Sequence, residues 1–188
     1  FGQIIKLDIE RKGDLIKDII FEILLPVLPT GYYWTNGIGN VLFSQVDLEI
    51  GGQLIDRHYS EWLQIWTELT LDISKREGYY RMIGNVPELY DPANAPGNNG
   101  IYPSYPTLGA PSIINRKIYL PLGFWFNKFS SMAFPLIAIQ KTVMYITFTF
   151  RRLQELYTVV DYQGTGKRVK PSQQAHYIGN FLQPSTGA

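Results

Sequence analysis

Apolar and polar residues alternate over several short stretches of this chain, and this pattern constrains the fold more than any other feature. Residues 5–9, 41–50 and 143–150 each place mainly apolar side chains on one parity and mainly polar side chains on the other. A period of two residues is typical of a β-strand with one buried face. Further strands are predicted at the less regular apolar runs 19–25, 113–126, 156–160 and 175–182. Many short strands favour an all-β antiparallel sandwich.

Turn residues suggest how the first strands are connected. The segment Arg11 to Asp14, which contains Gly13, lies between the first two apolar runs, so strands 5–9 and 19–25 are predicted to form a hairpin. Gly51 and Gly52 end the strand over 41–50, because glycine adopts backbone angles closed to other residues. We expect this glycine pair to lead abruptly from that strand into a helix.

The period changes to that of a helix between residues 58 and 69. Trp62, Ile65, Trp66 and Leu69 fall at i, i+3, i+4 and i+7, on one helical face. A short amphipathic helix is therefore predicted in a connection between strands. We expect Trp62 and Trp66 to pack into the core and plug the open end of the sandwich.

Residues 85–112 contain six prolines and no sustained period, so a long irregular loop is predicted. Loops of this length are usually functional or disordered, which makes this one a candidate outer-surface or contact loop. Its Tyr90, Tyr102 and Tyr105 fit either intermolecular contacts or packing onto the loop's own scaffold. In the predicted strand 113–126, three successive aromatic residues at 124–126 cannot share one face. At least one of them is expected to face a second layer or a neighbouring subunit.

Length and composition bound the classes of function. A chain of 188 residues suits one domain, predicted over residues 1–188. The formal charge of +1 gives no electrostatic footprint for binding nucleic acid directly. The longest apolar runs, 19–28 and 132–139, are interrupted by proline and too short for a transmembrane segment. Because the chain opens at Phe1 inside an apolar run, we expect a partial polypeptide, with an opening strand missing.

Residues that carry chemistry are sparse. His58 and His176 are far apart without a histidine partner at metal-ligand spacing, and cysteine is absent. We interpret His58 as a capping or packing residue. Residues 164–167 lack the leading glycine of a phosphate-binding loop, and residues 37–39 are too short for a dinucleotide fingerprint and are expected between strands.

Asp47 and Glu49 lie on one face of the predicted strand 41–50. Such a pair fits either the two carboxylates of a glycosidase or, more commonly, the solvated face of a strand. We favour the solvated face. The sequence therefore predicts no catalytic residues, no metal-ligating residues and no cofactor, and the chain is not expected to be an enzyme.

Three segments in order resemble the major capsid proteins of nucleocytoplasmic large DNA viruses. The first is FGQ at residues 1–3 followed by ERKGDLI at 10–16. The second is VDLEIGGQLID at 46–56 followed by the helix with Trp62 and Trp66. The third is LPLGFWFN at 120–127 with FPLIAIQ at 134–140. The resemblance covers about residues 1–151 and is loose beyond them.

This resemblance implies an antiparallel jelly-roll, the first of two tandem jelly-rolls of which the second is not present in this chain. It implies a structural virion protein of an icosahedral capsid shell, assembled in the host cell. The expected partners are further copies of the same protein in a homotrimeric, pseudo-hexagonal capsomer, neighbouring capsomers and minor capsid proteins.

Two other classes of function remain open. A jelly-roll carbohydrate-binding module is the main alternative, with the tyrosine-bearing loop 90–105 stacking on sugars. A metal-dependent jelly-roll oxygenase requires a cluster of histidine and carboxylate ligands, and the sequence does not contain one.

Overall fold

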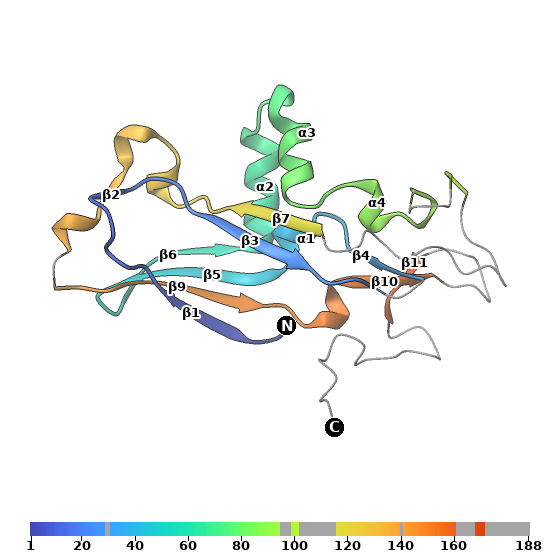
Figure 1. Cartoon of the computed structure of the whole chain (residues 1–188), viewed down its shortest axis with the longest axis horizontal. Helices are drawn as coiled ribbons and strands as arrows, with labels where there is room; N and C mark the ends of the chain where they lie inside the picture. The colour runs from blue at the N-terminus through green and yellow to red at the C-terminus, as the bar shows by residue number, and fades with distance from the viewer. Residues whose placement is uncertain (29–30, 95–98, 102–115, 140, 161–167, 172–188) are drawn as a thin grey trace.

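The computed structural model describes residues 1–28, 31–94, 99–101, 116–139, 141–160 and 168–171. Two layers of antiparallel strands face each other along most of its length (Figure 1). The larger layer is a four-stranded sheet in the order β1-β9-β5-β6. Its strands are Ile4–Asp8 (β1), Phe43–Ile50 (β5), Gln53–Tyr59 (β6) and Met144–Phe150 (β9).

The opposite layer is narrower and consists of β3 (Ile20–Leu25) paired with β7 (Arg116–Pro121). Two small sheets extend the sandwich at its ends. At one end Leu15–Ile16 (β2) pairs with Phe134–Pro135 (β8), and at the other Tyr157–Val160 (β10) lies between Tyr32–Trp34 (β4) and Arg168–Val169 (β11) (Figure 1).

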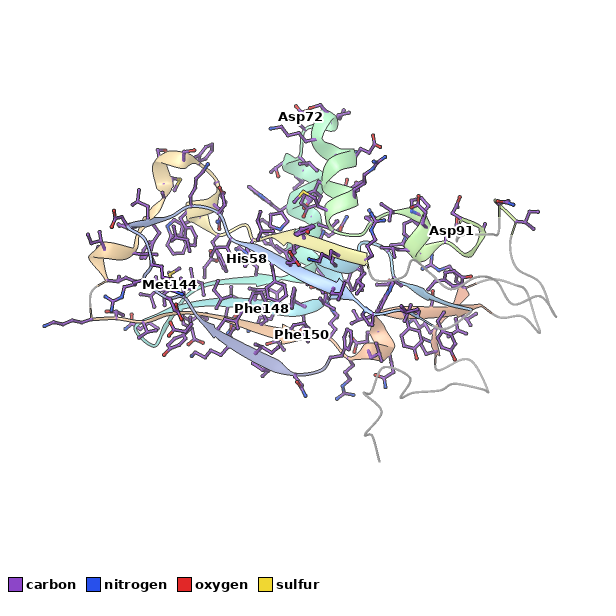
Figure 2. The ribbon with its side chains drawn as sticks, in the orientation of Figure 1. His58, Asp72, Asp91, Met144, Phe148 and Phe150 are labelled. Atoms are coloured by element: carbon purple, nitrogen blue, oxygen red, sulfur yellow. The ribbon has the colours of Figure 1, made fainter. Side chains whose placement is uncertain are left out.

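The hydrophobic core lies between the two main layers. Phe21 of β3 contacts Phe148 of β9 and Phe43 of β5, with ring centroids 4.5 and 5.3 Å apart. Met144, Ile146 and Phe148 alternate along β9 and are buried, as the sequence predicts (Figure 2). These contacts join the layers because each strand buries one parity of its side chains.

Helices occupy the connections. They are Ile38–Val41 (α1), Ser60–Thr70 (α2), Ile73–Met82 (α3) and Pro87–Tyr90 (α4), with 3₁₀ turns at Pro92–Asn94, Trp125–Asn127, Ser130–Met132, Leu136–Ala138 and Leu153–Glu155. Asp72 caps α3 by accepting a hydrogen bond from the backbone N–H of Ser74, 2.8 Å away. The pair α2–α3 projects away from the strands (Figure 1). Within the described ranges, no helix is long and apolar enough to cross a membrane.

The predicted hairpin between the first two strands is wrong. β1 pairs with β9 and β3 pairs with β7, so the turn around Gly13 carries the chain from one layer to the other. The alternation of apolar residues predicts that a strand exists and which face it buries. It contains no information about which distant strand will be its partner.

The glycine pair ends β5 as predicted, but it leads into a strand and not into a helix. Gly51 and Gly52 have φ angles of 63° and 79° and form a two-residue hairpin loop to β6. The chain enters α2 only after Tyr59. Sequence analysis missed β6 because it is an edge strand whose apolar residues, Leu54 and Ile55, are both 48% exposed.

The predicted strand over 113–126 is shorter than expected. Residues 113–115 lie outside the described residues, β7 ends at Pro121, and Trp125 begins a 3₁₀ turn. The turn lets Phe124 and Phe126 both be fully buried, while Trp125 is half-buried against Phe134. In a continuous strand, neighbouring aromatic side chains would point to opposite faces, and one of them would need a second layer to cover it. The 3₁₀ turn removes this requirement.

The proline-rich region is only partly a loop. Val86 and Leu89 are buried, at 8% and 0% exposure, and they anchor α4 to the core. Residues 102–112 lie outside the described residues, as does the predicted strand 175–182. The prediction of a continuous irregular loop is therefore wrong at residues 87–94, which form α4 and a 3₁₀ turn. Residues 99–101 are exposed as expected, and for residues 95–98 and 102–112 the loop stays a prediction.

Candidate assembly and binding surfaces

His58 is a packing residue on β6. Its side chain is 7% exposed and lies against the ring of Phe124, with centroids 5.0 Å apart. Nε2 is 3.4 Å from a carboxylate oxygen of Asp56. Burial lowers the pKa of His58, and the charge of Lys128 acts in the same direction, whereas Asp56 opposes both. His58 does not cap α2, whose N-cap residue is Tyr59.

The structure shows no metal centre among the residues that it describes. No group of three or more histidine, cysteine, aspartate or glutamate side chains converges there. His176 lies outside the described ranges.

The two carboxylates on β5 serve the sheet. Asp47 is 7% exposed and accepts two hydrogen bonds from Arg57 of β6, at 2.8 and 2.9 Å. The prediction that Asp47 lies on a solvated face is therefore wrong. Glu49 forms an ion pair with Lys6 of β1. Because each carboxylate is held by a cation on another strand, neither is free to act as a general acid or base.

The short glycine motif at 37–39 does open a helix, contrary to the prediction. Gly37 adopts a left-handed conformation with φ of 58° and precedes α1. The N–H of Gly39 donates a hydrogen bond to the carbonyl oxygen of Ile83 at 2.8 Å. That N–H is therefore occupied by the protein and does not face a phosphate. Residues 164–167 lie outside the described residues.

The helix α2 has the predicted position but buries the other face. Its buried residues are Ser60, Leu63 and Thr67. Trp62 is 45% exposed and Leu69 is 75% exposed, so the prediction that the Trp62 face packs into the core is wrong.

Thr67, on the buried face of α2, has hydrogen-bonding partners there. Its hydroxyl donates to the carbonyl oxygen of Leu63 at 2.8 Å and lies 3.1 Å from the hydroxyl of Tyr79 in α3. The Tyr79 hydroxyl in turn lies 3.3 Å from the amide oxygen of Asn40. A buried polar residue needs hydrogen-bonding partners, and the spacing of apolar residues in the sequence does not show whether it has them.

Among the described residues, exposed apolar side chains gather on two surfaces that concern assembly. The first is the helical stripe, which we define as Trp62, Ile65, Leu69 and Ile73, exposed by 45–83%. The second is the strand surface, defined as Ile5 and Leu7 of β1 with Leu24 of β3, exposed by 40–59%.

The strand surface corrects a prediction about β1. Ile5 and Leu7 were expected to face a buried layer, but they are 40% and 42% exposed. β1 lies at the edge of a four-stranded sheet that is faced by only two strands. The narrow layer therefore leaves the inner side of β1 uncovered among the described residues.

A groove lies beside the base of the helical stripe. It is lined by aromatic and charged side chains of β6, α2 and residues 123–128, and its volume is about 450 Å³. The Nζ of Lys128 lies 4.7 Å from the centre of a Trp66 ring at this groove. Sequence analysis missed it because residues 123–128 reach α2 only through the tertiary fold.

Comparison with known proteins gives a consistent result. The family model for the major capsid protein N-terminus matches residues 1–181. The chain is 35% identical over 187 residues to the major capsid protein of Phaeocystis pouchetii virus, covering 90% of this chain and 35% of that protein. It is 32% identical over 175 residues to capsid protein 1 of Acanthamoeba polyphaga mimivirus, covering 86% and 28% respectively.

Solved structures agree with these relatives. A quasi-atomic model of the PBCV-1 virus capsid superposes with a TM-score of 0.63 at 30% identity, covering 89% of this chain and 36% of that chain. This similarity confirms the predicted jelly-roll fold. The chain spans about a third of the length of the curated relatives it matches. It belongs to the family of major capsid protein N-terminal regions.

Proposed function

We propose that this chain is a structural part of an icosahedral virion shell, in which subunits assemble into homotrimeric, pseudo-hexagonal capsomers. The observation that carries the proposal is the family match over residues 1–181, together with the similarity to the PBCV-1 capsid. Residues 1–188 form one jelly-roll in this proposal, and a second roll belongs to the same subunit. Neighbouring capsomers and minor capsid proteins are its further partners.

The uncovered surfaces support a role in assembly. The helical stripe and the strand surface expose large aliphatic and aromatic side chains that a monomeric protein would keep from water. They lie on separate elements, α2–α3 and β1–β3, so different neighbours have room to cover them (Figure 1). A subunit surrounded by other subunits needs more than one contact surface.

We also propose that the chain has no catalytic activity. Asp47 and Glu49 are paired with Arg57 and Lys6, and His58 is packed against Phe124. Among the described residues, the two carboxylates and the imidazole are therefore engaged in structural contacts and are not free to act on a substrate.

The test is the oligomeric state of the full-length subunit that contains this chain. Light scattering after size-exclusion chromatography is expected to give three times the subunit mass. Electron microscopy of particles from infected cells should place the same polypeptide in the shell. A full-length protein that stays monomeric and is absent from the shell would contradict the proposal.

A further inference from the structure

The helical pair α2–α3 contributes little to the hydrophobic core. α3 has no buried residue, and the buried residues of α2 are Ser60, Leu63 and Thr67, two of which are polar. The larger apolar side chains of the pair form the exposed helical stripe instead. In contrast, β5 and β9 each bury three apolar side chains between the layers. An element with few buried apolar contacts opens more readily than the core of the same protein.

A buried cluster of polar side chains ties the pair to the roll. Asn40 of α1 is fully buried, and its amide oxygen accepts a hydrogen bond from the Tyr79 hydroxyl at 3.3 Å. Its Nδ2 donates to Oε1 of Gln64 at 3.0 Å, and the Thr67 hydroxyl lies 3.1 Å from that of Tyr79. We call these four residues the latch. It joins both α2 and α3 to α1.

The base of the pair is fixed on both sides. Where α2 begins, the Ser60 hydroxyl oxygen accepts a hydrogen bond from Arg151 at 2.5 Å. Where α3 ends, Ile83 is fully buried and its carbonyl oxygen accepts from the N–H of Gly39 at 2.8 Å. The chain therefore enters and leaves the pair at anchored points, while the helices between them project away from the strands (Figure 1).

Contacts within the pair hold its two helices to each other. The Tyr80 hydroxyl of α3 donates to a Glu68 carboxylate oxygen of α2 at 2.6 Å, and Arg76 lies 3.8 Å from the same carboxylate. Asp72 caps α3 at the turn between the helices. None of these contacts involves the strands. They can persist when the latch opens, so the two helices can move together.

The latch and the core respond differently to water. When the latch opens, water can form hydrogen bonds with each of its polar groups, which offsets most of the bonds lost. Exposing the apolar side chains of β5 and β9 has no such compensation. Opening of the latch therefore costs less free energy than separation of the two layers.

We propose that α2–α3 is a hinged arm that the latch holds against the roll, and that the arm opens as one unit while the strands stay folded. Because the helical stripe lies on this arm, each opening changes the angle between the stripe and the roll. The inference concerns the subunit itself. It goes beyond the role in the shell and does not depend on it.

Hydrogen–deuterium exchange of the full-length subunit, followed by mass spectrometry, gives a direct test. Peptides from residues 62–82 are expected to share one protection factor, because the two helices open together. That factor should be at least about tenfold lower than the protection of β5 and β9 in the same molecule.

Variants test the latch. Tyr79→Phe removes the hydroxyl bonded to Asn40 and keeps the ring, so it is expected to speed exchange in α2–α3 about fivefold and leave β9 unchanged. Thr67→Val, which removes the second hydroxyl, should act in the same direction. The matched control is Tyr80→Phe, because the partner of the Tyr80 hydroxyl lies within the arm. Its exchange is expected to change less than about twofold.

Either of two results would overturn the proposal. One is protection of α2–α3 as strong as that of β9 in the unmodified subunit. The other is faster exchange in Tyr79→Phe that affects β9 as much as the helices, which would mean that the pair opens only when the whole roll unfolds. Circular dichroism of each variant establishes that it is folded before exchange is measured.

Discussion

The imidazole ring of His58 stacks on the ring of Phe124, with 5.0 Å between the centroids and 25° between the planes. Phe124 is fully buried, so His58 has an apolar wall on one side. Burial beside this wall removes water from the ring and so favours the neutral imidazole over the charged one. The consequence is a link between pH and the stability of the β6 edge.

Acidification is expected to destabilise the protein through His58. Burial holds its pKa below 6.5 in the folded protein, so the unfolded chain takes up a proton more readily. The stabilising contribution of the neutral ring is fully present above pH 6.5 and is lost as the pH falls from there toward the lower, folded pKa. His58→Gln should show a flatter decrease of the thermal midpoint between pH 7.5 and 5.5. Identical pH profiles for the two proteins would contradict this.

Phe148→Ala is expected to lower the free energy of unfolding by about 3–5 kcal/mol. Phe148 is 1% exposed and joins the two layers through its contacts with Phe21 and Phe43. Phe129→Ala is the matched control, because Phe129 is 66% exposed and should cost less than about 0.5 kcal/mol. The free energy of unfolding of both variants is measured in urea. An equal loss for the two variants would show that Phe148 does not lie in the core.

Substitutions of the two glycines in the β5–β6 hairpin are expected to differ in their effect on stability. A Cβ at Gly51 would lie 2.8 Å from Thr142 Cγ2, whereas a Cβ at Gly52 meets nothing within 4 Å. Asparagine tolerates the left-handed region, so Gly51→Asn should be more destabilising than Gly52→Asn by about 1–3 kcal/mol.

A second substitution tests the cause of that difference. Adding Thr142→Ser removes the methyl group that the new Cβ meets, and should restore most of the stability of Gly51→Asn. If the double variant is no more stable than the single variant in thermal unfolding, the contact with Thr142 is not the reason.

Residues 1–188 expressed alone are expected to self-associate, because the described residues leave the helical stripe and the strand surface exposed. Leu69→Lys with Ile73→Lys should shift light scattering toward the monomer, since these side chains are 75% and 83% exposed. Lys75→Gln, on the exposed side of α3, is the control and should leave association unchanged. A monodisperse monomer of the unmodified chain at high concentration would contradict the expectation.

The sequence predicted the individual strands more successfully than their arrangement. β9 was predicted almost to the residue because its alternation is regular and its inward face is buried. The partners of β1 and β3 were not predictable, since pairing depends on strands more than ninety residues away. The edge strand β6 escaped notice because an edge need not bury an apolar face.

The helix α2 shows a second limit. Its period was correct, but a stripe of apolar residues marks a contact face without saying whether this chain or another molecule covers it. The three residues that α2 buries include Ser60 and Thr67, which depend on hydrogen bonds from Arg151 and to Leu63. The groove was missed for a related reason, because its tryptophans come from segments nearly sixty residues apart.

The pairing of β1 with β9 sets the earliest time at which the four-stranded sheet can form during synthesis on the ribosome. Ile4 lies opposite Thr149, so β1 has its hydrogen-bonding partner only after about 145 further residues are made. At synthesis rates of about 5–20 residues per second, β1 waits roughly 7–30 s with its isoleucines and leucine exposed. Strand closure across so long a loop is intrinsically slow as well. When many copies are translated close together, chaperones or dilution are therefore expected to be needed to keep unpaired β1 strands from pairing with one another.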